Sequence, residues 1–330
     1  MSDALNFIDS TKNDKISYLR GLDLQELIVQ IENYYLEYRD TLNLINDVTF
    51  GTEIEYEGID RYHTDKFIEN KEEWRSKGDG SLNSGGEIIS PVLTDQIKTW
   101  QELKEICSFL KQKKVITTGN AAGHVHVGAH ILGNDCNKWI KFIKLYIIYE
   151  HIIFRFIYGD KINLRKKGIE YAKPIADDLY AILHKIIKIK DVRELSNLLP
   201  DHKYQAINFK NINYHNVLSK RTKNTLEFRG PNASSEEIIW QNNINALTKS
   251  MLSPNSLDEE FLNYKLKYER VSYITAPHLY TQICLKNVLE FCDLVFDNNL
   301  DKVYFLRQYI KGFQENFQSN ITYEAKKFTR

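Results

Sequence analysis

The chain contains 330 residues, of which 42% are hydrophobic and 12% aromatic, so it is long and apolar enough to bury a large core. Lysine plus arginine and aspartate plus glutamate both number 44, which makes the formal net charge zero. This balance argues against the broad basic surface of a nucleic-acid-binding protein and against a solvating acidic protein. We therefore expect a globular protein without a nucleic-acid partner.

Nothing in the chain predicts secretion or membrane insertion. The N-terminal segment MSDALNFIDSTKND lacks the charged and then apolar pattern of a signal peptide. The most apolar stretch, residues 139–158, contains interrupting polar residues and predicts a helix buried on one face rather than a membrane span: Lys141, Lys144, Glu150, His151 and Arg155. The four cysteines form no CxxC pair, which favours free thiols in a reducing compartment. We expect a cytoplasmic protein that does not bind membranes.

Taken in chain order, the hydrophobic pattern predicts helices separated by short strands. The first helix is expected over residues 16–47, where Leu24, Leu27 and Ile31 recur at helical spacing. Later helices are expected over residues 99–114, 137–160, 176–190, 236–252 and 257–268, and over much of 280–328. Strands are expected over residues 48–56, within the glycine-rich stretch 73–91, and over 122–132, 204–213 and 225–230. Because the strands are scattered between helices and several follow each other closely, the predicted fold class is α+β with an antiparallel sheet.

Four strand-like segments carry charged or imidazole side chains within an otherwise apolar pattern. They place Glu53 and Glu55 in FGTEIEYEG, Glu87 in GGEIISP, His124 and His126 in GHVHVG, and Glu227 and Arg229 in LEFRG. Successive side chains of a strand point to opposite faces, so each i, i+2 pair shares one face. The intervening Ile54, Val125 and Phe228 are expected to face the other way and to pack under helices.

These residue types favour metal-assisted chemistry with phosphates. Carboxylates on one face repel each other unless they are solvated or cations lie between them. Mg²⁺ takes oxygen ligands and commonly joins carboxylates to nucleotide phosphates, and a guanidinium such as that of Arg229 can neutralise a transferred phosphoryl group. The chain has no GxxxxGK[ST] phosphate loop and no GxGxxG, HExxH or GxSxG motif, so ATP would not bind through a P-loop.

Each motif alone has a plainer interpretation. Glu53 and Glu55 could form a solvated stripe, and Glu227 and Arg229 a weak surface ion pair. A zinc site at His124 and His126 lacks a third ligand at a familiar spacing. The coincidence of four such segments favours a shared site.

In this order the motifs resemble those of the amidoligase family, a branch of the glutamine synthetase and glutamate–cysteine ligase superfamily. FGTEIEYEG resembles the family's first strand, and WRSKGDGSLNSGGEIISPVL resembles its segment of W, K, DGS and E-I-V-S-P. GNAAGHVHVG, YQAINF and NTLEFRG resemble its HVHVG, Y-x-x-L-N and E-F-R segments. The resemblance covers roughly residues 48–235.

The resemblance implies a fold like the glutamine synthetase catalytic domain. A curved antiparallel sheet would carry helices on its outer face and would hold ATP and two or more Mg²⁺ ions on its concave face. The expected division is an N-terminal helical extension over residues 1–47, a catalytic sheet domain with inserted helices over 48–235, and a C-terminal helical region over 236–330 packed on the same domain.

The resemblance also implies which residues hold metal. Glu55 and Glu87 would bind one ion. Glu53, His124 and Glu227 would bind a second ion, which bridges the β- and γ-phosphates of the nucleotide.

The remaining roles concern phosphate and the substrates. Arg229 would stabilise the transferred phosphoryl group, and His126 would contact phosphate or the substrate carboxylate. Lys77, Asp79 and Ser81 would flank the amine acceptor and nucleotide. Asp79 would either help to deprotonate the amine or only form the turn before its glycine.

The implied function is an ATP- and Mg²⁺-dependent carboxylate–amine ligase that forms an isopeptide-type amide through an acyl phosphate. Its partners would be a carboxylate donor and an amine acceptor, including a peptide or protein side chain. Two alternatives stay open: a phosphotransferase of the guanidino-kinase type on the same fold, and a non-catalytic nucleotide-binding module. The chain departs from the family at Gln205, where a basic residue is common; Lys203, Lys210 or Arg221 could replace it.

Overall fold

The computed structural model describes residues 8, 14–82, 84–115, 120–159, 166–220 and 223–310. This part of the chain is a mixed α/β structure with a six-stranded antiparallel sheet, in agreement with the predicted fold class. Its strands are β1 (Phe50–Glu57), β2 (Arg75–Lys77), β3 (Gly85–Ile89), β4 (Gly123–Gly128), β5 (Ile207–Asn208) and β6 (Thr225–Phe228). They lie in the order β2-β3-β1-β4-β6-β5, so the longest strand, β1, pairs with β3 on one side and with β4 on the other.

Strand alternation gives the sheet an apolar back and an ionic front. Ile54 and Val125 are fully buried and Phe228 is nearly so, and all three belong to the hydrophobic core. Their sequence neighbours, the glutamates and histidines of β1, β4 and β6, therefore project from the opposite face. The predicted orientation of these three apolar residues is confirmed.

Three helices cover the back of the sheet: α4 (Ile97–Gln112), α5 (Cys136–Tyr158) and α8 (Glu237–Leu252). The ring of Phe228 meets Phe142 of α5 edge to face at 6.5 Å. At Gly123 the approach of Trp240 from α8 is so close that a Cβ would lie 2.3 Å from the indole, so β4 needs a glycine there. Burial of these aromatic side chains fixes the sheet to the helical layer.

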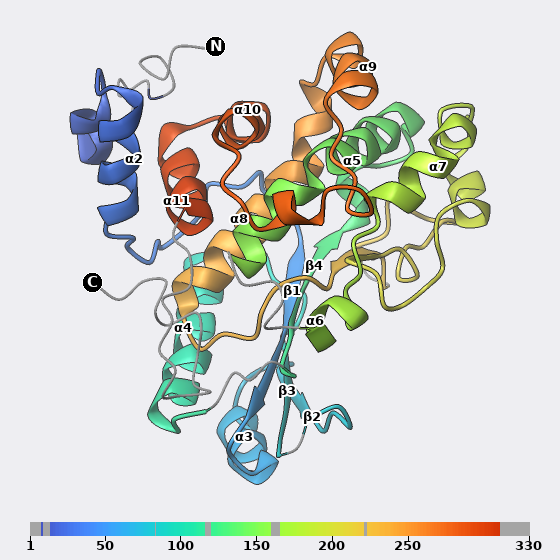
Figure 1. Ribbon diagram of the computed structural model, residues 1–330. Helices are drawn as coiled ribbons and strands as arrows, with labels where there is room; N and C mark the ends of the chain where they lie inside the picture. The colour runs from blue at the N-terminus through green and yellow to red at the C-terminus, as the bar shows by residue number, and fades with distance from the viewer. Residues whose placement is uncertain are drawn as a thin grey trace.

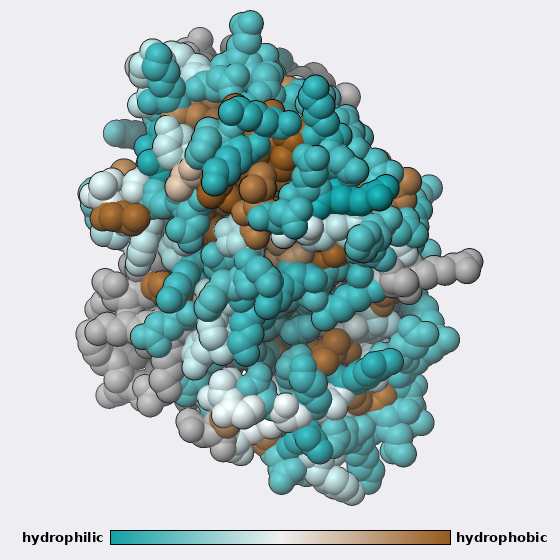
Figure 2. Space-filling view, turned by 90° about the vertical axis from the view of Figure 1, so that its right-hand side faces the viewer, coloured by the Kyte–Doolittle hydropathy of each residue, from teal (hydrophilic) through white to brown (hydrophobic). Residues whose placement is uncertain are grey.

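The remaining helices are α2 (Leu24–Asn33), α3 (Arg61–Ile68), α6 (Lys166–Tyr171), α7 (Ala176–Ile186), α9 (Glu259–Tyr268), α10 (Leu285–Val295) and α11 (Asn299–Ile310). Of these helices, α7, α9, α10 and α11 pack against α5, α2 packs against α11, and α3 packs against β2 and β3. In Figure 1, α7, α9, α10 and α11 gather with α5 at one end of the molecule, and β2, β3 and α3 lie at the other. Within the described ranges no helix has the length and apolar character needed to cross a bilayer. The face in Figure 2 is largely hydrophilic, with hydrophobic side chains in smaller groups.

The first predicted helix is too long, because α2 ends at Asn33 and the chain then continues without helix to β1. Asp95 holds this segment: its carboxylate accepts hydrogen bonds of 2.8 Å from the backbone N–H groups of Leu42 and Leu44. In a helix, these N–H groups would instead donate hydrogen bonds to carbonyl oxygens of the same helix. A side chain more than 50 residues away in the sequence thus replaces the helical hydrogen bonds, and the local hydrophobic periodicity does not reveal this.

Two smaller predictions also differ from the structure. The strand expected over 204–213 is limited to β5, and the strand expected over 122–132 ends at Gly128. Helix α3 was not predicted; Asp60 caps it by accepting a hydrogen bond of 2.8 Å from the N–H of Tyr62. The part of the last predicted helix beyond residue 310 lies outside the described residues.

A buried carboxylate joins α5 to two distant segments. Glu150 accepts hydrogen bonds from the backbone N–H groups of Ile175 and Ala176, at 2.6 and 3.1 Å, and from the hydroxyl of Tyr280 at 2.7 Å. Two of these donors are the otherwise unpaired amides at the start of α7. The position of α7 therefore depends on a carboxyl group in the core.

This carboxyl group makes stability depend on pH. Burial raises the pKa of Glu150 to about 7, although its hydrogen bonds oppose the rise. Because the folded protein holds this proton more tightly than the unfolded chain, the stability that Glu150 contributes is complete below the usual pKa of 4.5 and is lost as the pH rises toward 7. Glu150→Gln stays neutral, so we expect the unfolding free energy of the wild type, relative to the variant, to fall by about 2 to 3 kcal/mol between pH 5 and pH 8. Denaturant unfolding at both pH values measures this difference, and a difference independent of pH would contradict it.

Candidate active site

The front of the sheet brings the ionic side chains of four strands, β1, β3, β4 and β6, into directly opposed pairs. Glu55 of β1 lies opposite Glu87 of β3, and Glu53 lies opposite His124 of β4. One step further along the sheet, His126 lies opposite Glu227 of β6. Opposed side chains in an antiparallel sheet have Cβ atoms about 5 Å apart. Residues separated by more than 170 positions in the sequence therefore share one small surface.

Glu53 is the centre of this surface. One carboxylate oxygen lies 2.7 Å from Nδ1 of His124, and the other lies 3.0 Å from Nε2 of His126. Burial opposes ionisation of Glu53, but the hydrogen bonds and charges of the two imidazoles hold its pKa well below the usual range. In return, Glu53 raises the pKa of His124 against the effect of that ring's burial. Glu53 is therefore an anion in the folded protein.

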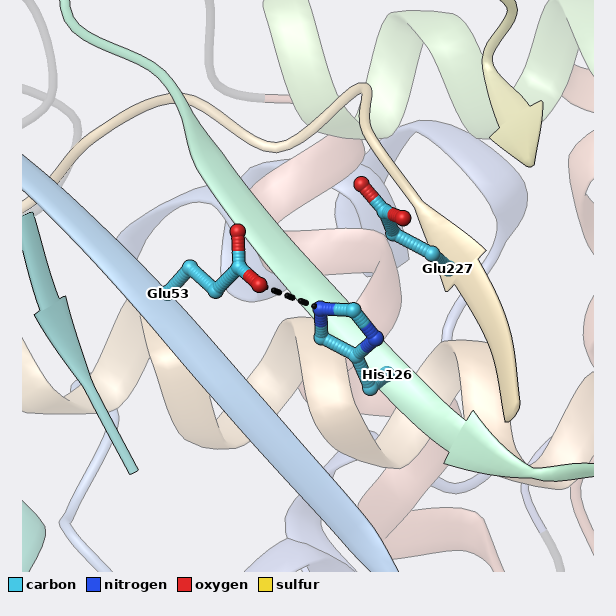
Figure 3. A group of neighbouring side chains, drawn as sticks. All are labelled: Glu53, His126 and Glu227. Atoms are coloured by element: carbon cyan, nitrogen blue, oxygen red, sulfur yellow. Dashed lines mark hydrogen bonds and ion pairs between the residues drawn. The ribbon is translucent and has the colours of Figure 1, made fainter. Parts of the chain in front are cut away.

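Glu53, His126 and Glu227 form a group that can hold a metal ion. Each offers a ligand atom, and these atoms all lie within 4.8 Å of one another. Figure 3 shows the three side chains converging from β1, β4 and β6. His124, which was expected in this set, lies beside it, with Nδ1 3.7 Å from a Glu227 oxygen. Two carboxylates and an imidazole suit a divalent cation with mainly oxygen ligands.

Glu55 and Glu87 form a second acidic pair. Their exposed fractions are only 5% and 2%, so their repulsion is poorly screened by water. Glu55 accepts a hydrogen bond of 2.6 Å from the N–H of Ala122, and Glu87 lies 3.1 Å from Nζ of Lys77. Burial and the charge of Glu53 raise the pKa of Glu87, against the opposing effect of Lys77. A cation between the two carboxylates would relieve this cost.

Two asparagines outside the predicted set of site residues hold the Glu227 carboxylate in place. Nδ2 of Asn208 lies 2.8 Å and Nδ2 of Asn211 lies 3.0 Å from the same Glu227 oxygen. The other oxygen accepts from the guanidinium of Arg229. Asn208 is the asparagine of YQAINF, a motif whose pattern alone does not predict this contact. These donors fix the carboxylate in one orientation, as outer-shell partners do at metal sites.

The larger of two adjoining cavities on this face is here called the acidic cavity. Its volume is about 460 Å³, within the range of small-molecule sites. Most of the predicted site residues line it: Glu53, Glu55, Lys77, Asp79, Ser81, Glu87, His124 and Arg229. Asp79 accepts a hydrogen bond of 2.7 Å from the N–H of Ser81, as a turn-forming aspartate does. Tyr158, Tyr171, Lys203 and Tyr204 also line it.

The neighbouring lysine cavity shares Glu53 and Lys77 with the acidic cavity and has a volume of about 440 Å³. It contains His126, so this predicted residue faces the second cavity rather than the first. Among the described residues that line it, Glu53 is the sole acid, whereas Lys77, Lys220 and Lys223 are basic. Lys220 and Lys223 precede β6 and belong to none of the motifs that predicted the site.

Removal of one carboxylate tests the metal-binding group. Glu227→Gln keeps the shape of the side chain but removes its charge, so we expect Mn²⁺ affinity to fall at least about tenfold, as measured by electron paramagnetic resonance. Glu105→Gln is the control, because this exposed glutamate pairs with Lys71 away from the sheet front. Equal Mn²⁺ affinity in the wild type and Glu227→Gln would exclude Glu227 as a ligand.

Comparison with known proteins agrees with the motifs. A family model described as "Putative amidoligase enzyme" matches residues 64–251, more than half of the chain. The match spans Glu87, His124, His126, Glu227 and Arg229 and begins after β1, which carries Glu53 and Glu55. No curated protein matches the chain. The chain belongs to the amidoligase family.

Proposed function

We propose that the protein is an ATP- and Mg²⁺-dependent ligase that joins a carboxylate to an amine through an acyl phosphate. The supporting observation is the convergence of four glutamates, two histidines and Arg229 on one face of the sheet, in a member of the amidoligase family. The antiparallel sheet with helices on its back is compatible with a glutamine synthetase-like catalytic domain, which we propose as its closer relationship.

The donor atoms are suited to two magnesium ions. Glu53, His126 and Glu227, with His124 beside them, would hold one ion, and Glu55 with Glu87 would hold a second. When bound, the ions would screen the negative charge of the phosphates.

The two cavities offer separate places for nucleotide and donor. The lysine cavity has more basic than acidic lining residues and contains His126 and Glu53 of the metal-binding group, so it suits the triphosphate. The acidic cavity, on the other side of Glu53, would then take the donor carboxylate and the amine. This arrangement would let a carboxylate oxygen approach the γ-phosphorus from the side opposite the β-phosphate, so that ADP leaves as the acyl phosphate forms, as in-line transfer requires.

The chain's own side chains would handle charge and protons. Arg229, at the edge of the acidic cavity, would stabilise the phosphoryl group during transfer. The carboxylates of Glu55, Glu87 and Asp79 would attract a protonated amine, and Asp79 on the β2–β3 loop would accept its proton before attack. The amine nitrogen then forms the amide bond, and inorganic phosphate leaves from the acyl carbon.

Substitution of Glu55 and Arg229 tests the proposed chemistry. We expect Glu55→Gln and Arg229→Ala each to reduce ADP formation by at least about a hundredfold, because each removes charge at the phosphoryl group or its metal. The assay combines the protein with ATP, Mg²⁺, carboxylic acids and amines, and follows ADP together with new amide masses. Circular dichroism checks that both variants fold. ADP release at the parent rate in both would refute the site, and phosphorylated acid accumulating without need for an amine would identify a phosphotransferase instead.

Lys223 tests the proposed nucleotide cavity. It is exposed and forms no ion pair within the described ranges, whereas Lys220 pairs with Asp47. We expect Lys223→Ala to weaken the binding of ATP with Mg²⁺ by about fivefold, because an exposed charge contact contributes up to about 1 kcal/mol. Calorimetric titration measures this change. Unchanged ATP affinity in Lys223→Ala would move the phosphates out of the lysine cavity.

A further inference from the structure

One wall of the acidic cavity combines tyrosines with a lysine and has no role in the chemistry described above. This tyrosine wall consists of Tyr158, Tyr171, Lys203 and Tyr204. The rings of Tyr171 and Tyr204 meet edge to face at 5.1 Å. Nζ of Lys203 lies 4.8 Å from the centre of the Tyr204 ring, close enough for a cation–π interaction.

Tyr158 comes from the end of α5, and the other three wall residues come from two chain segments that are hydrogen-bonded to each other and to the end of β6. The N–H of Lys173 donates to the carbonyl of Tyr204 at 2.9 Å, and the N–H of Ala206 donates to the carbonyl of Lys173 at 2.8 Å. The N–H of Arg229 donates to the carbonyl of Ala206 at 2.9 Å, and its Nε lies 3.4 Å from the carbonyl of Tyr171. The backbone that carries the wall is therefore held in register with Arg229.

Lys203 differs from the other two cations of the acidic cavity. Lys77 pairs with Glu87, and Arg229 pairs with Glu227. Across the described ranges, Lys203 has no acidic partner, and the hydroxyl groups of Tyr171 and Tyr204 have no hydrogen-bond partner. The wall thus presents one unneutralised charge and two phenol donors next to a floor of carboxylates. An anionic group that lies in this cavity away from bound metal would be attracted to the tyrosine wall.

We propose that the tyrosine wall binds a second carboxylate of the donor substrate, so that the donor is a dicarboxylate or a larger acid with two such groups. This inference rests on the proposed ligase function. One carboxylate would lie over the metal-binding floor and react, and the other would be held by Lys203 and the phenols of Tyr171 and Tyr204. The acidic floor repels a second anionic group and directs it to this wall.

The structure distinguishes Lys203 from the other basic residues near this segment. Lys203 lines the cavity, whereas Lys210 pairs with Asp201 at 3.2 Å and does not line it. Arg221 lies outside the described residues. Lys203 is therefore the specificity-determining residue of the proposal, and Lys210 is a matched control on the same stretch of chain.

Direct binding tests the proposal without turnover. Succinate, glutarate and adipate, and the monoamide of each, are titrated by calorimetry into the wild-type protein with Mg²⁺ present. We expect at least one diacid to bind about fivefold more tightly than its monoamide, the scale of an exposed ion pair aided by hydrogen bonds. Lys203→Ala should abolish this preference, Lys203→Arg should retain it, and Lys210→Ala should leave it unchanged.

Several results would overturn the proposal. One is that the wild type shows no preference for any diacid over its monoamide. Another is that Lys203→Ala keeps the preference. A Lys203-dependent preference for glycine over glycinamide, without one for diacids, would assign the wall to the amine acceptor and would also refute the proposal. These outcomes are separate from the ligase function: ADP and amide formation without a Lys203 effect rejects only the wall, and a Lys203 effect without ADP formation rejects only the ligase.

Discussion

The contact of Glu53 with two imidazoles is the interaction on which the rest of the site depends. Its oxygens lie 2.7 Å from His124 and 3.0 Å from His126, and the same carboxylate lines both cavities. Because the imidazoles keep Glu53 ionised despite its burial, a negative charge is fixed at the middle of the sheet. The two cavities meet at this carboxylate, so molecules bound in them would lie close together, as a reaction between two bound molecules requires.

The ionic front is supported by the apolar back. Ile54, Val125 and Phe228 alternate with the site residues and bury their side chains among the helices behind the sheet. A slip of one residue in any central strand would move carboxylates into the core, so the hydrophobic packing specifies the register that aligns the site. The opposed buried glutamates of β1 and β3 lower the stability of the fold, because their negative charges repel each other. Such a loss of stability is expected where a functional site needs closely spaced charges.

Much of this arrangement could be predicted from the sequence. The alternation around Glu53, His124 and Glu227 identified the strands and the shared face, because period-two patterns are local and strong. The extended segment after α2 could not be predicted, since it depends on Asp95, a tertiary partner. The roles of Asn208 and Lys223 escaped prediction for a similar reason. Their importance comes from the carboxylate that one orients and the cavity that the other lines, not from a residue pattern.

The central claim is that divalent metal binds on the front of the sheet between separated strands. The most direct measurement is a crystal structure of the protein soaked with Mn²⁺ and a non-hydrolysable ATP analogue, with anomalous scattering used to locate the metal. We expect a Mn²⁺ peak about 2.2 Å from carboxylate oxygens of Glu53 and Glu227, with the triphosphate beside it. Metal and nucleotide bound away from Glu53 and Glu227, or no binding at saturating concentrations, would contradict it.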